Sequence, residues 1–413
     1  MTTAATVLAR CAELDRISAR PHRLERVHLT PQHAAANRLT ASWMAAAGLT
    51  PWQDPAGNQW GRREGRAPGL PALVLGSHLD TVPDAGSYDG MLGVVMAVAV
   101  AERLRGTDLP LALEVVGFGD EEGTRFGTAL LGSRAVAGTW DPAWWELRDA
   151  EGVSLHRAFV DFGLDPSRVG EATRTPDELV GYLEAHIEQG TCLEAADRSL
   201  GYVTTIAGAR RFRLVVLGEA RHAGSTPYER RRDALAGAGE VVLAVERLAQ
   251  AHGCIATVGR LEVHPGAVNV VPGRADLSVD LRAATDAERD GMWDVLGAEI
   301  ESICVRRGLR LEVAENHRAP AVACAPWLQQ AVVEGIGATD DHGRDQPMGL
   351  WSRAGHDAMA MAAITDVGML FLRCTDGISH GPDEGVREID VARGLDALEA
   401  AVLRVAAAVE ERT

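Results

Sequence analysis

The hydrophobic positions of the first third of the chain fall into short unbroken runs that alternate with longer helical patterns. The runs at 72–78 and 111–119 predict buried strands. The segments 91–104 and 127–137 carry the spacing of helices. This alternation is typical of an α/β domain with a mixed, mostly parallel sheet that is covered by helices on both faces.

From about residue 208 the pattern changes to strands with one polar face, separated by two long helices. The expected elements are strands at 211–220, 254–263, 274–283 and 309–315 and helices at 233–251 and 286–307. Their order, βαββαβ, is that of a ferredoxin-like α+β module. After 319–320 the first pattern returns, with a helix from 326, a strand at 367–374 and a closing helix from 390. We therefore expect a discontinuous larger domain, 1–207 and 323–413, and an inserted domain, 208–322.

Composition narrows the class of protein. The chain has 413 residues, of which 46% are hydrophobic, so it can bury a large core. Its formal net charge of −17 repels phosphate, and we expect neither nucleic acid nor an anionic membrane as a partner. The longest apolar run, 91–101, is too short to span a bilayer, and charged residues interrupt any signal peptide. These features predict a soluble, cytoplasmic protein, and the six cysteines, without CxxC spacing, favour reduced thiols.

Side chains of the kinds that bind metal ions recur where strands of the larger domain are expected to end. They are His78, Asp89, the pair Glu121 and Glu122, His186 and His380. Imidazole nitrogens combined with carboxylate oxygens suit zinc, manganese, cobalt or nickel. The set exceeds what one tetrahedral ion requires, whereas two ions that share a carboxylate and a bridging water account for it.

Each of these residues also has a plainer explanation. A single histidine at a strand end is usually a hydrogen-bonded polar residue, and adjacent acids such as Glu121 and Glu122 are usually solvated. Asp80 can cap the turn that follows it, and Asp89 can cap the helix that begins near Gly90. The joint placement at four strand ends, beside glycines, favours a shared site.

Several motifs extend this pattern over nearly the whole chain. They are GSHLDTVPDAGSYDG (76–90), GDEEGTRFG (119–127), AHIEQG (185–190), GEARHAGSTPYERRRDA (218–234), GAVNVVPG (266–273), DLR (280–282), AGHDAM (354–359) and GISHGPDE (377–384). Through them the chain resembles the M20-type metallopeptidase and aminoacylase superfamily, and within it the hydantoinase/carbamoylase branch. That branch contains N-carbamoyl-L-amino acid hydrolases, allantoate amidohydrolases and β-ureidopropionases. The histidine of AHIEQG points to it.

The resemblance implies a dinuclear metal centre, which makes the larger domain the catalytic one. His78, Asp89 and His186 would hold one ion, and Asp89, Glu122 and His380 the other, with Asp89 as the bridge.

Two further carboxylates have implied roles near the ions. Asp80 would orient His78, a role that usually supports metal binding. Glu121 would be the general base, because it sits beside a ligand without being one. It would take a proton from the bridging water and pass it to the leaving nitrogen.

The same resemblance makes the inserted domain a lid and the dimerisation surface of a homodimer. His222, Asn269 and Arg282 would bind the substrate, partly from the partner subunit, and Gln189 would contact its ureido group. His222 would also be catalytic, as a donor to the oxyanion. From the pattern alone, we would expect Arg282 to be a solvent-facing arginine on a strand. His222 would be a loop histidine that is hydrogen-bonded to nearby residues.

The implied activity is hydrolysis of the ureido C–N bond of a small anionic substrate, an N-carbamoyl-L-amino acid or allantoate. Ammonia and carbon dioxide would be released. An aminoacylase or dipeptidase of the same superfamily is the alternative enzyme, and a catalytically silent binding protein is a third hypothesis. Tyr228, Arg353 and Gly381 depart from the usual pattern of relatives, and the first two would narrow or recharge the substrate pocket.

Overall fold

The computed structural model describes residues 2–339 and 346–412. The chain divides into two compact units. The first unit comprises Met1–Thr204, Cys324–Leu350 and Gly355–Thr413, and the second comprises Thr205–Ala323 and Trp351–Ala354. The second unit is thus an insertion that also takes up four residues, Trp351–Ala354, which the sequence pattern placed in the larger domain.

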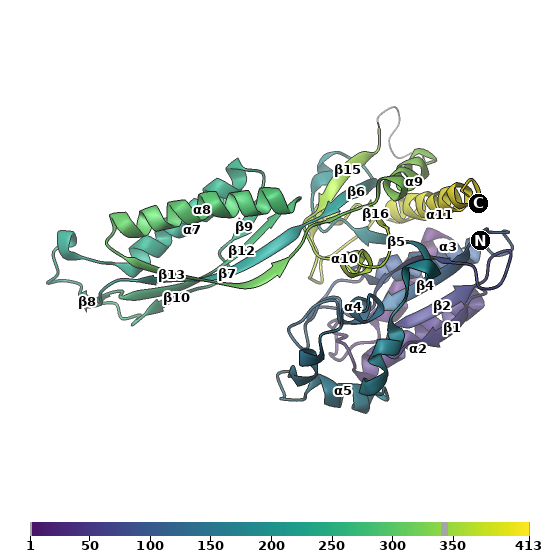
Figure 1. Cartoon of the computed structure of the whole chain (residues 1–413), viewed down its shortest axis with the longest axis horizontal. Helices are drawn as coiled ribbons and strands as arrows, with labels where there is room; N and C mark the ends of the chain where they lie inside the picture. Colours follow the sequence, from purple (N-terminus) through teal and green to yellow (C-terminus); the bar gives the residue numbers. More distant parts are fainter. Residues whose placement is uncertain (1, 340–345, 413) are drawn as a thin grey trace. The chain divides into compact units, whose positions relative to one another are not determined.

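A nine-stranded sheet runs in the order β1-β2-β4-β3-β5-β16-β6-β14, with β15 beside β6 (Figure 1). The strands are β1 (Thr50–Gln53), β2 (Gln59–Arg63), β3 (Ala72–His78), β4 (Ala112–Phe118), β5 (Leu179–Ile187), β6 (Leu200–Ile206), β14 (Val322–Ala323), β15 (Met348–Ser352) and β16 (Val367–Leu372). The central strands β4, β3, β5 and β16 are parallel neighbours. Antiparallel pairs, such as β1 with β2 and β6 with β16, flank them. The mixed, mostly parallel sheet that the sequence predicts is confirmed.

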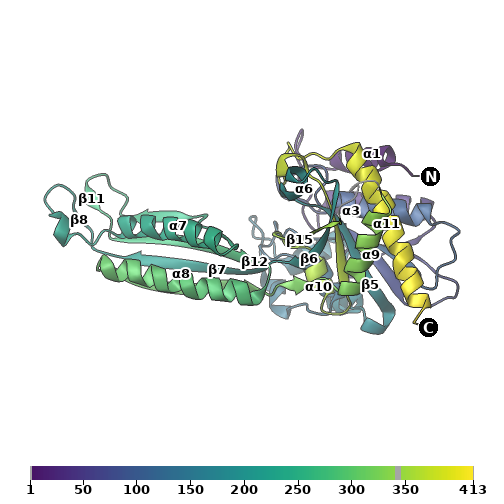
Figure 2. The ribbon, with the colours of Figure 1, turned by 90° about the horizontal axis from the view of Figure 1, so that it is seen from above.

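Helices cover both faces of this sheet. The helices of the first unit are α1 (Ala4–Asp15), α2 (Pro31–Ala46), α3 (Met91–Arg103), α4 (Leu131–Val136), α5 (Leu155–Phe162), α6 (Cys192–Ala195), α9 (Pro326–Gly337), α10 (Ala358–Met361) and α11 (Glu388–Glu410). α3 packs on β3, β4 and β5, and α9 and α11 lie side by side and contact β16 (Figure 2). In β5, Leu183 and Ala185 join the core around α3. Because side chains alternate along a strand, Glu184 faces the other way, where it accepts from the Ala358 N–H of α10.

Two predicted elements differ from the structure in their make-up, and others differ only in their bounds, such as the strand expected at 211–220, which lies at Gly208–Leu217. The helix expected at 127–137 begins only at Leu131, because Gly127 and Leu130 have left-handed φ values of 72° and 66° that interrupt a helix. The strand expected at 254–263 is two short strands, β9 (Ile255–Thr257) and β10 (Leu261–His264), separated by a segment that contains Gly259.

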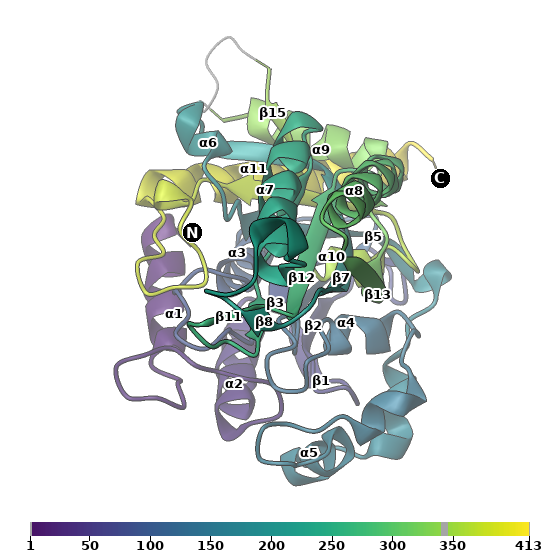
Figure 3. The same ribbon diagram turned by 90° about the vertical axis from the view of Figure 1, so that its left-hand side faces the viewer.

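The second unit is built on a five-stranded antiparallel sheet of order β10-β12-β7-β13, with β9 also pairing β12. Its longer strands are β7 (Gly208–Leu217), β12 (Arg274–Ala283) and β13 (Arg310–Ala319). Helices α7 (Ala234–Ala251) and α8 (Asp286–Arg306) lie side by side and pack on this sheet (Figure 3). A short ladder of β8 (Arg221–His222) and β11 (Val270–Val271) adds a separate two-stranded piece. This is the ferredoxin-like arrangement that the sequence predicts.

None of the helices in the described ranges is long and apolar enough to cross a membrane. The six cysteines all lie in these ranges as free thiols, and all but Cys192 are buried.

Candidate metal centre

Four segments that bear the predicted metal ligands meet at one edge of the large sheet. His78 is the last residue of β3, and His186 is the last but one of β5. Glu122 follows β4, and His380 follows β16. The four strands are parallel neighbours, so their carboxyl ends share an edge, which is where α/β sheets place their sites.

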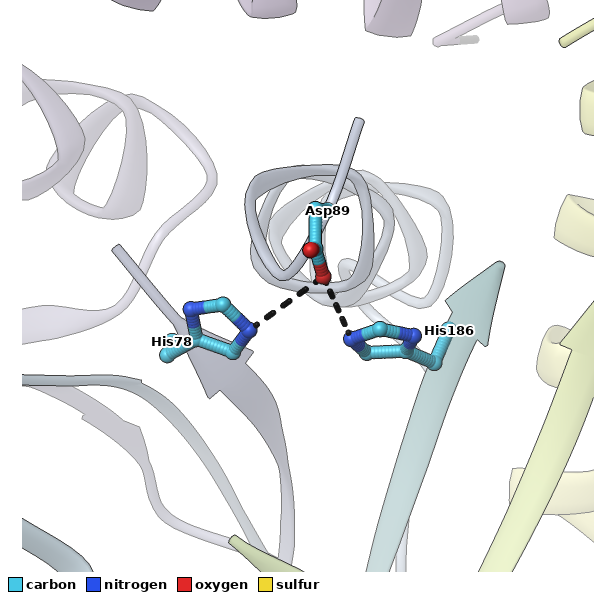
Figure 4. Close-up of side chains that lie close together, drawn as sticks. All are labelled: His78, Asp89 and His186. Carbon is cyan, nitrogen blue, oxygen red and sulfur yellow. Dashed lines mark ion pairs between the residues drawn. The ribbon is translucent and has the colours of Figure 1, made fainter. Parts of the chain in front are cut away.

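Asp89 lies at the centre of these side chains. Its Oδ1 is 3.6 Å from Nε2 of His78 and 3.2 Å from Nε2 of His186, so both rings face the same oxygen (Figure 4). Its Oδ2 is 3.0 Å from Nε2 of His380. The helix α3 begins after Gly90 with no side-chain cap, so Asp89 is not the helix cap that its position also allowed.

The electrostatics of the cluster follow from this geometry. Burial alone would favour the neutral form of Asp89, but its ion pairs with His186, His380 and His78 hold the pKa of the carboxyl well below its ordinary value. Burial likewise opposes a charge on His78, yet the Asp89 carboxylate raises the pKa of that imidazole well above its usual range. The cluster therefore keeps a buried carboxylate ionised, as a cation ligand must be.

The Nδ1 atoms of two imidazoles, whose Nε2 atoms face Asp89, are hydrogen-bonded to backbone carbonyl oxygens. Nδ1 of His78 is 3.0 Å from the Asp80 carbonyl oxygen, and Nδ1 of His186 is 2.9 Å from that of Ile187. A carbonyl can only accept, so each Nδ1 donates its proton to it, and Nε2 is the nitrogen that a metal ion would bind after displacing the proton that faces Asp89. Metal-binding histidines are commonly oriented in this way through their other nitrogen.

A second group of ligand atoms surrounds Oδ2 of Asp89. Oε1 of Glu122 lies 3.4 Å from Nε2 of His380. Burial, together with the Asp89 carboxylate, raises the pKa of Glu122 to about 7. Gln189 also reaches this group, because its amide donates to Asp89 Oδ2 at 3.1 Å and to Ser379 Oγ at 3.0 Å. The backbones of Gln189 and His380 are left-handed, with φ of 54° and 57°, which is strain of the kind found at functional sites.

Glu121 lies beside the cluster, and its carboxylate, His78 and Glu122 form a further set of closely spaced ligand atoms. Burial raises the pKa of Glu121 well above its ordinary value, and although His78 opposes this, the neighbouring acids add to it. Asp80 fixes this loop rather than capping a local turn. Its Oδ1 accepts from the Glu121 N–H at 3.0 Å and its Oδ2 from the Glu122 N–H at 3.2 Å. The same Oδ1 is 3.7 Å from Nδ1 of His78.

Gly90 allows the chain to pass this close to His78. Its φ is 66°, a left-handed conformation that glycine adopts without strain. A Cβ at this position would overlap the His78 ring. The glycine that follows the central carboxylate is therefore required both by the backbone and by the packing of the site.

Two buried residues next to the cluster had no assigned role in the sequence. His356 packs edge-on against His186, with ring centroids 4.5 Å apart. Glu184 accepts from Ser77 Oγ at 2.7 Å, and with His186 and His356 it forms another closely spaced set of ligand atoms. His356 lies in the motif AGHDAM, and Glu184 directly precedes AHIEQG. Only the folded sheet brings both residues to His186.

The predicted substrate residues lie in the second unit, where His222 and Asn269 are neighbours. The Ala223 N–H donates to the Asn269 carbonyl at 2.8 Å, and His222 pairs with Val270. Nδ1 of His222 accepts from the N–H groups of Gly224 and Ser225, each at 3.1 Å. The ring therefore carries its proton on Nε2, as a side chain that donates to an oxyanion requires.

Arg282 lies at the other end of β12 from these two residues. Its Nε donates to Asp280 at 2.8 Å, and Nη1 donates to the Arg353 carbonyl oxygen at 2.8 Å. The stretch from Arg274 to Arg282 spans roughly 25 Å at ~3.3 Å per residue. Within this unit the structure does not bring Arg282 to His222 and Asn269.

The three departures from the usual pattern are placed differently. Tyr228 is 81% exposed, and the guanidinium of Arg231 lies over its ring at 4.1 Å. Arg353 stacks on Trp351 at 5.5 Å. A Cβ on Gly381 would meet no atom within 4 Å, so no close packing requires glycine there.

Comparisons with known proteins agree with this geometry. The model of peptidase family M20/M25/M40 matches residues 74–404. An N-carbamoyl-L-amino acid amidohydrolase of Geobacillus stearothermophilus is 39% identical over 393 residues, which is 94% of this chain and 95% of that one. An allantoate deiminase of Arabidopsis thaliana is 37% identical over 423 residues, 95% of this chain and 81% of that one. The crystal structure of a hydantoinase/carbamoylase family amidase from Burkholderia multivorans has a TM-score of 0.88 at 33% identity and covers 98% of both chains. The chain therefore belongs to peptidase family M20/M25/M40 and, within it, to the hydantoinase/carbamoylase branch.

Proposed function

We propose that this chain is a metal-dependent amidohydrolase that cleaves the ureido C–N bond of a small anionic acid and releases ammonia and carbon dioxide. The substrate class is an N-carbamoyl-L-amino acid or an allantoate-type acid, as the names of the two similar enzymes suggest. The observation that carries the proposal is the Asp89 carboxylate, with two imidazoles facing one oxygen and a third facing the other.

The residues present fit two divalent ions, of zinc, manganese, cobalt or nickel. His78, Asp89 and His186 would hold one, and Asp89, Glu122 and His380 the other, since the ligand atoms of each group lie within 4.8 Å of one another. Nitrogen and carboxylate donors without thiolates suit these ions. When bound, such ions lower the pKa of a coordinated water and polarise the carbonyl to be attacked.

Glu121 would move the protons of the reaction. It is buried, and its pKa is raised. It lies close to His78 and Glu122, but the two groups of ligand atoms that contain Asp89 do not include it. A base with a raised pKa can accept a proton near neutral pH and return it to a leaving nitrogen. Asp80 holds the Glu121 backbone in place, so it is a positioning residue for this step.

Side chains of the second unit would recognise the substrate. Arg282 has five N–H donors, of which three are used on Asp280 and Arg353, so two remain for a substrate carboxylate. His222 would donate from Nε2 to the oxyanion, with Asn269 beside it. Gln189, whose amide already lies at the cluster, would contact the ureido group.

The separation of these residues supports a homodimer. One small substrate cannot span the roughly 25 Å from Arg282 to the end of β12 that lies next to His222 and Asn269. If both ends serve the same substrate, they must come from two copies, which makes the second unit the dimerisation surface as well as a lid. Mixing inactive His222→Ala and Arg282→Ala proteins should then restore activity, because half of the sites in the mixed dimer are intact. If the mixture shows no restored activity, the two subunits do not share their substrate sites.

The activity is tested by ammonia release from allantoate, ureidopropionate and several N-carbamoyl-L-amino acids, with manganese or zinc added. The N-acetyl form of each amino acid separates the proposed enzyme from an aminoacylase. Hydrolysis of N-acetyl but not N-carbamoyl forms would replace the proposal by that alternative.

The role of Glu121 is tested by Glu121→Gln, which keeps the size of the side chain but removes the base. We expect kcat to fall by about 10²- to 10⁴-fold, the usual contribution of a general base. Metal content should be unchanged, because the pairs around Asp89 remain. Activity close to that of the unmodified protein would show that another group moves the proton.

A further inference from the structure

Glu384 links the loop that carries Asp89 to the loop that carries His380. Its side chain is 7% exposed. Its Oε1 accepts from the Tyr88 N–H at 2.7 Å and from the Asp89 N–H at 3.0 Å. Its Oε2 accepts from Ser379 Oγ at 2.9 Å. One buried carboxylate thus binds the backbone of the central ligand and a side chain next to His380.

The packing around Glu384 is as tight as its hydrogen bonding. Gly86 lies so close that a Cβ there would overlap the Glu384 side chain. Ser379 is itself shared, because it is also 3.4 Å from Asp89 Oδ2 and accepts from the Gln189 amide. A carboxylate this deeply buried is costly unless its oxygens are hydrogen-bonded, so the arrangement is specific.

Asp80 does the same for a different loop. It accepts from two successive backbone N–H groups, those of Glu121 and Glu122. Glu384 accepts from Tyr88 and Asp89, again two successive N–H groups. Each carboxylate fixes one acidic segment of the cluster through its backbone and leaves the acidic side chain free to face the histidines.

We propose that Glu384 is a positioning residue that sets metal affinity by holding Asp89 in register with the loop of His380. The proposal rests on the proposed metal centre, but not on the identity of the substrate. Without Glu384, two buried N–H groups lose their acceptor and Ser379 loses its partner, so Asp89 and His380 are no longer tied to each other. Groups behind metal ligands typically change affinity by 10- to 100-fold when removed.

The experiment compares Glu384→Ala, Glu384→Gln and the control Asp383→Ala, which removes an exposed carboxylate from the same loop. Binding of Mn²⁺ and Zn²⁺ to metal-free protein is measured by calorimetry, and the visible spectrum of the Co²⁺-loaded protein reports ligand geometry. For Glu384→Ala we expect about 10- to 100-fold weaker binding and an altered Co²⁺ spectrum. Excess metal should restore kcat while KM stays unchanged.

Glu384→Gln should retain most of the affinity, because its amide oxygen can accept from both N–H groups and its NH₂ can donate to Ser379. Should Glu384→Ala fail to fold, Ser379→Ala decides, because it removes the donor to Glu384 Oε2: a smaller loss of affinity is expected, and unchanged affinity would count against the proposal. Unchanged affinity in a folded Glu384→Ala, or an equal loss in Asp383→Ala, would overturn the proposal. Metal binding without hydrolysis of any ureido acid would contradict the proposed function and leave this test intact.

Discussion

Two pairs of buried histidines in the first unit have nearly the same geometry and opposite chemistry. The rings of His78 and His186 are tilted with centroids 5.8 Å apart, and those of His28 and His33 are tilted with centroids 5.1 Å apart. All four side chains are at most 2% exposed. Asp89 faces the first pair, whereas the second pair packs against Phe159 and Phe162.

The surroundings set the charge of each pair. Despite burial, Asp89 raises the pKa values of His78 and His186. Burial lowers the pKa of His28 well below its ordinary value and that of His33 to about 3. Closeness and burial are common to both pairs, so the converging carboxylate is what distinguishes the pair in the proposed metal centre. The sequence carried this signal, because RVHLTPQHAAAN (26–37) contains no acid, whereas Asp80 and Asp89 follow His78 closely.

The strongest test of the comparison is to remove the carboxylate. Asp89→Asn should make the metal-site pair resemble His28 and His33, with no anion between the rings. We expect metal affinity to fall by more than the ~10- to 100-fold typical of groups behind the ligands. Activity should fall with it. Calorimetric titration of metal-free protein with Zn²⁺ measures the change.

The control is Asp84→Asn in the same loop, which pairs with Arg23 at 2.6 Å on the surface. It should bind metal as the unmodified protein does. Retention of full affinity by Asp89→Asn would show that the histidines alone suffice and that the comparison is wrong.

A smaller disturbance is to push one ring out of place. Gly90→Ala puts a methyl group against His78 and forces a left-handed alanine, which costs roughly 1–2 kcal/mol. We expect metal affinity to fall about 10- to 100-fold, as when ligand orientation is lost. Gly106→Ala is a matched control, because its φ is 87° but nothing lies within 4 Å of the added group.

Urea unfolding and metal titration separate the two effects of Gly90→Ala. Gly106→Ala should lose only the stability that a left-handed alanine costs, whereas Gly90→Ala should lose more, because its methyl group overlaps His78, and should also bind metal more weakly. Equal affinity in the two variants would mean that the site tolerates a displaced His78.

Sequence alone could predict the large features because they depend on local pattern and topology. The bounds of β3 and β12 match the predicted strands, and α3 ends within one residue of the predicted helix. Parallel neighbours must end at one edge, so the convergence of His78, His186 and the loop acids followed from the order of elements.

What could not be predicted depends on contacts between distant segments. Glu384 reaches Asp89 from 295 residues away, and nothing local to either residue specifies that approach. His356 meets His186 only through the packing of the folded sheet. The start of α4 at Leu131 depends on left-handed turns that helical spacing does not reveal.

The least disruptive test leaves the metal centre alone and changes the other pair. The pKa of His33 is lowered from 6.5 to about 3, by burial and by Arg26. Below pH 6.5 the unfolded chain therefore binds a proton that the native protein excludes, and stability falls as the pH drops toward 3. Between pH 7 and pH 5 this loss is about 2 kcal/mol.

His33→Gln should remove this part of the loss while keeping an acceptor for the Leu29 N–H, which now donates to Nδ1 at 3.0 Å. Free energies of unfolding in urea at pH 7 and pH 5 give the difference for each protein, so contributions of the other groups cancel. The control His22→Gln, at an exposed position, should leave the difference unchanged. Metal affinity and kcat should be unaltered in both variants, because neither ring faces a carboxylate of the cluster. An unchanged pH dependence in His33→Gln would show that this histidine is charged in the native protein and would remove the contrast with His78 and His186.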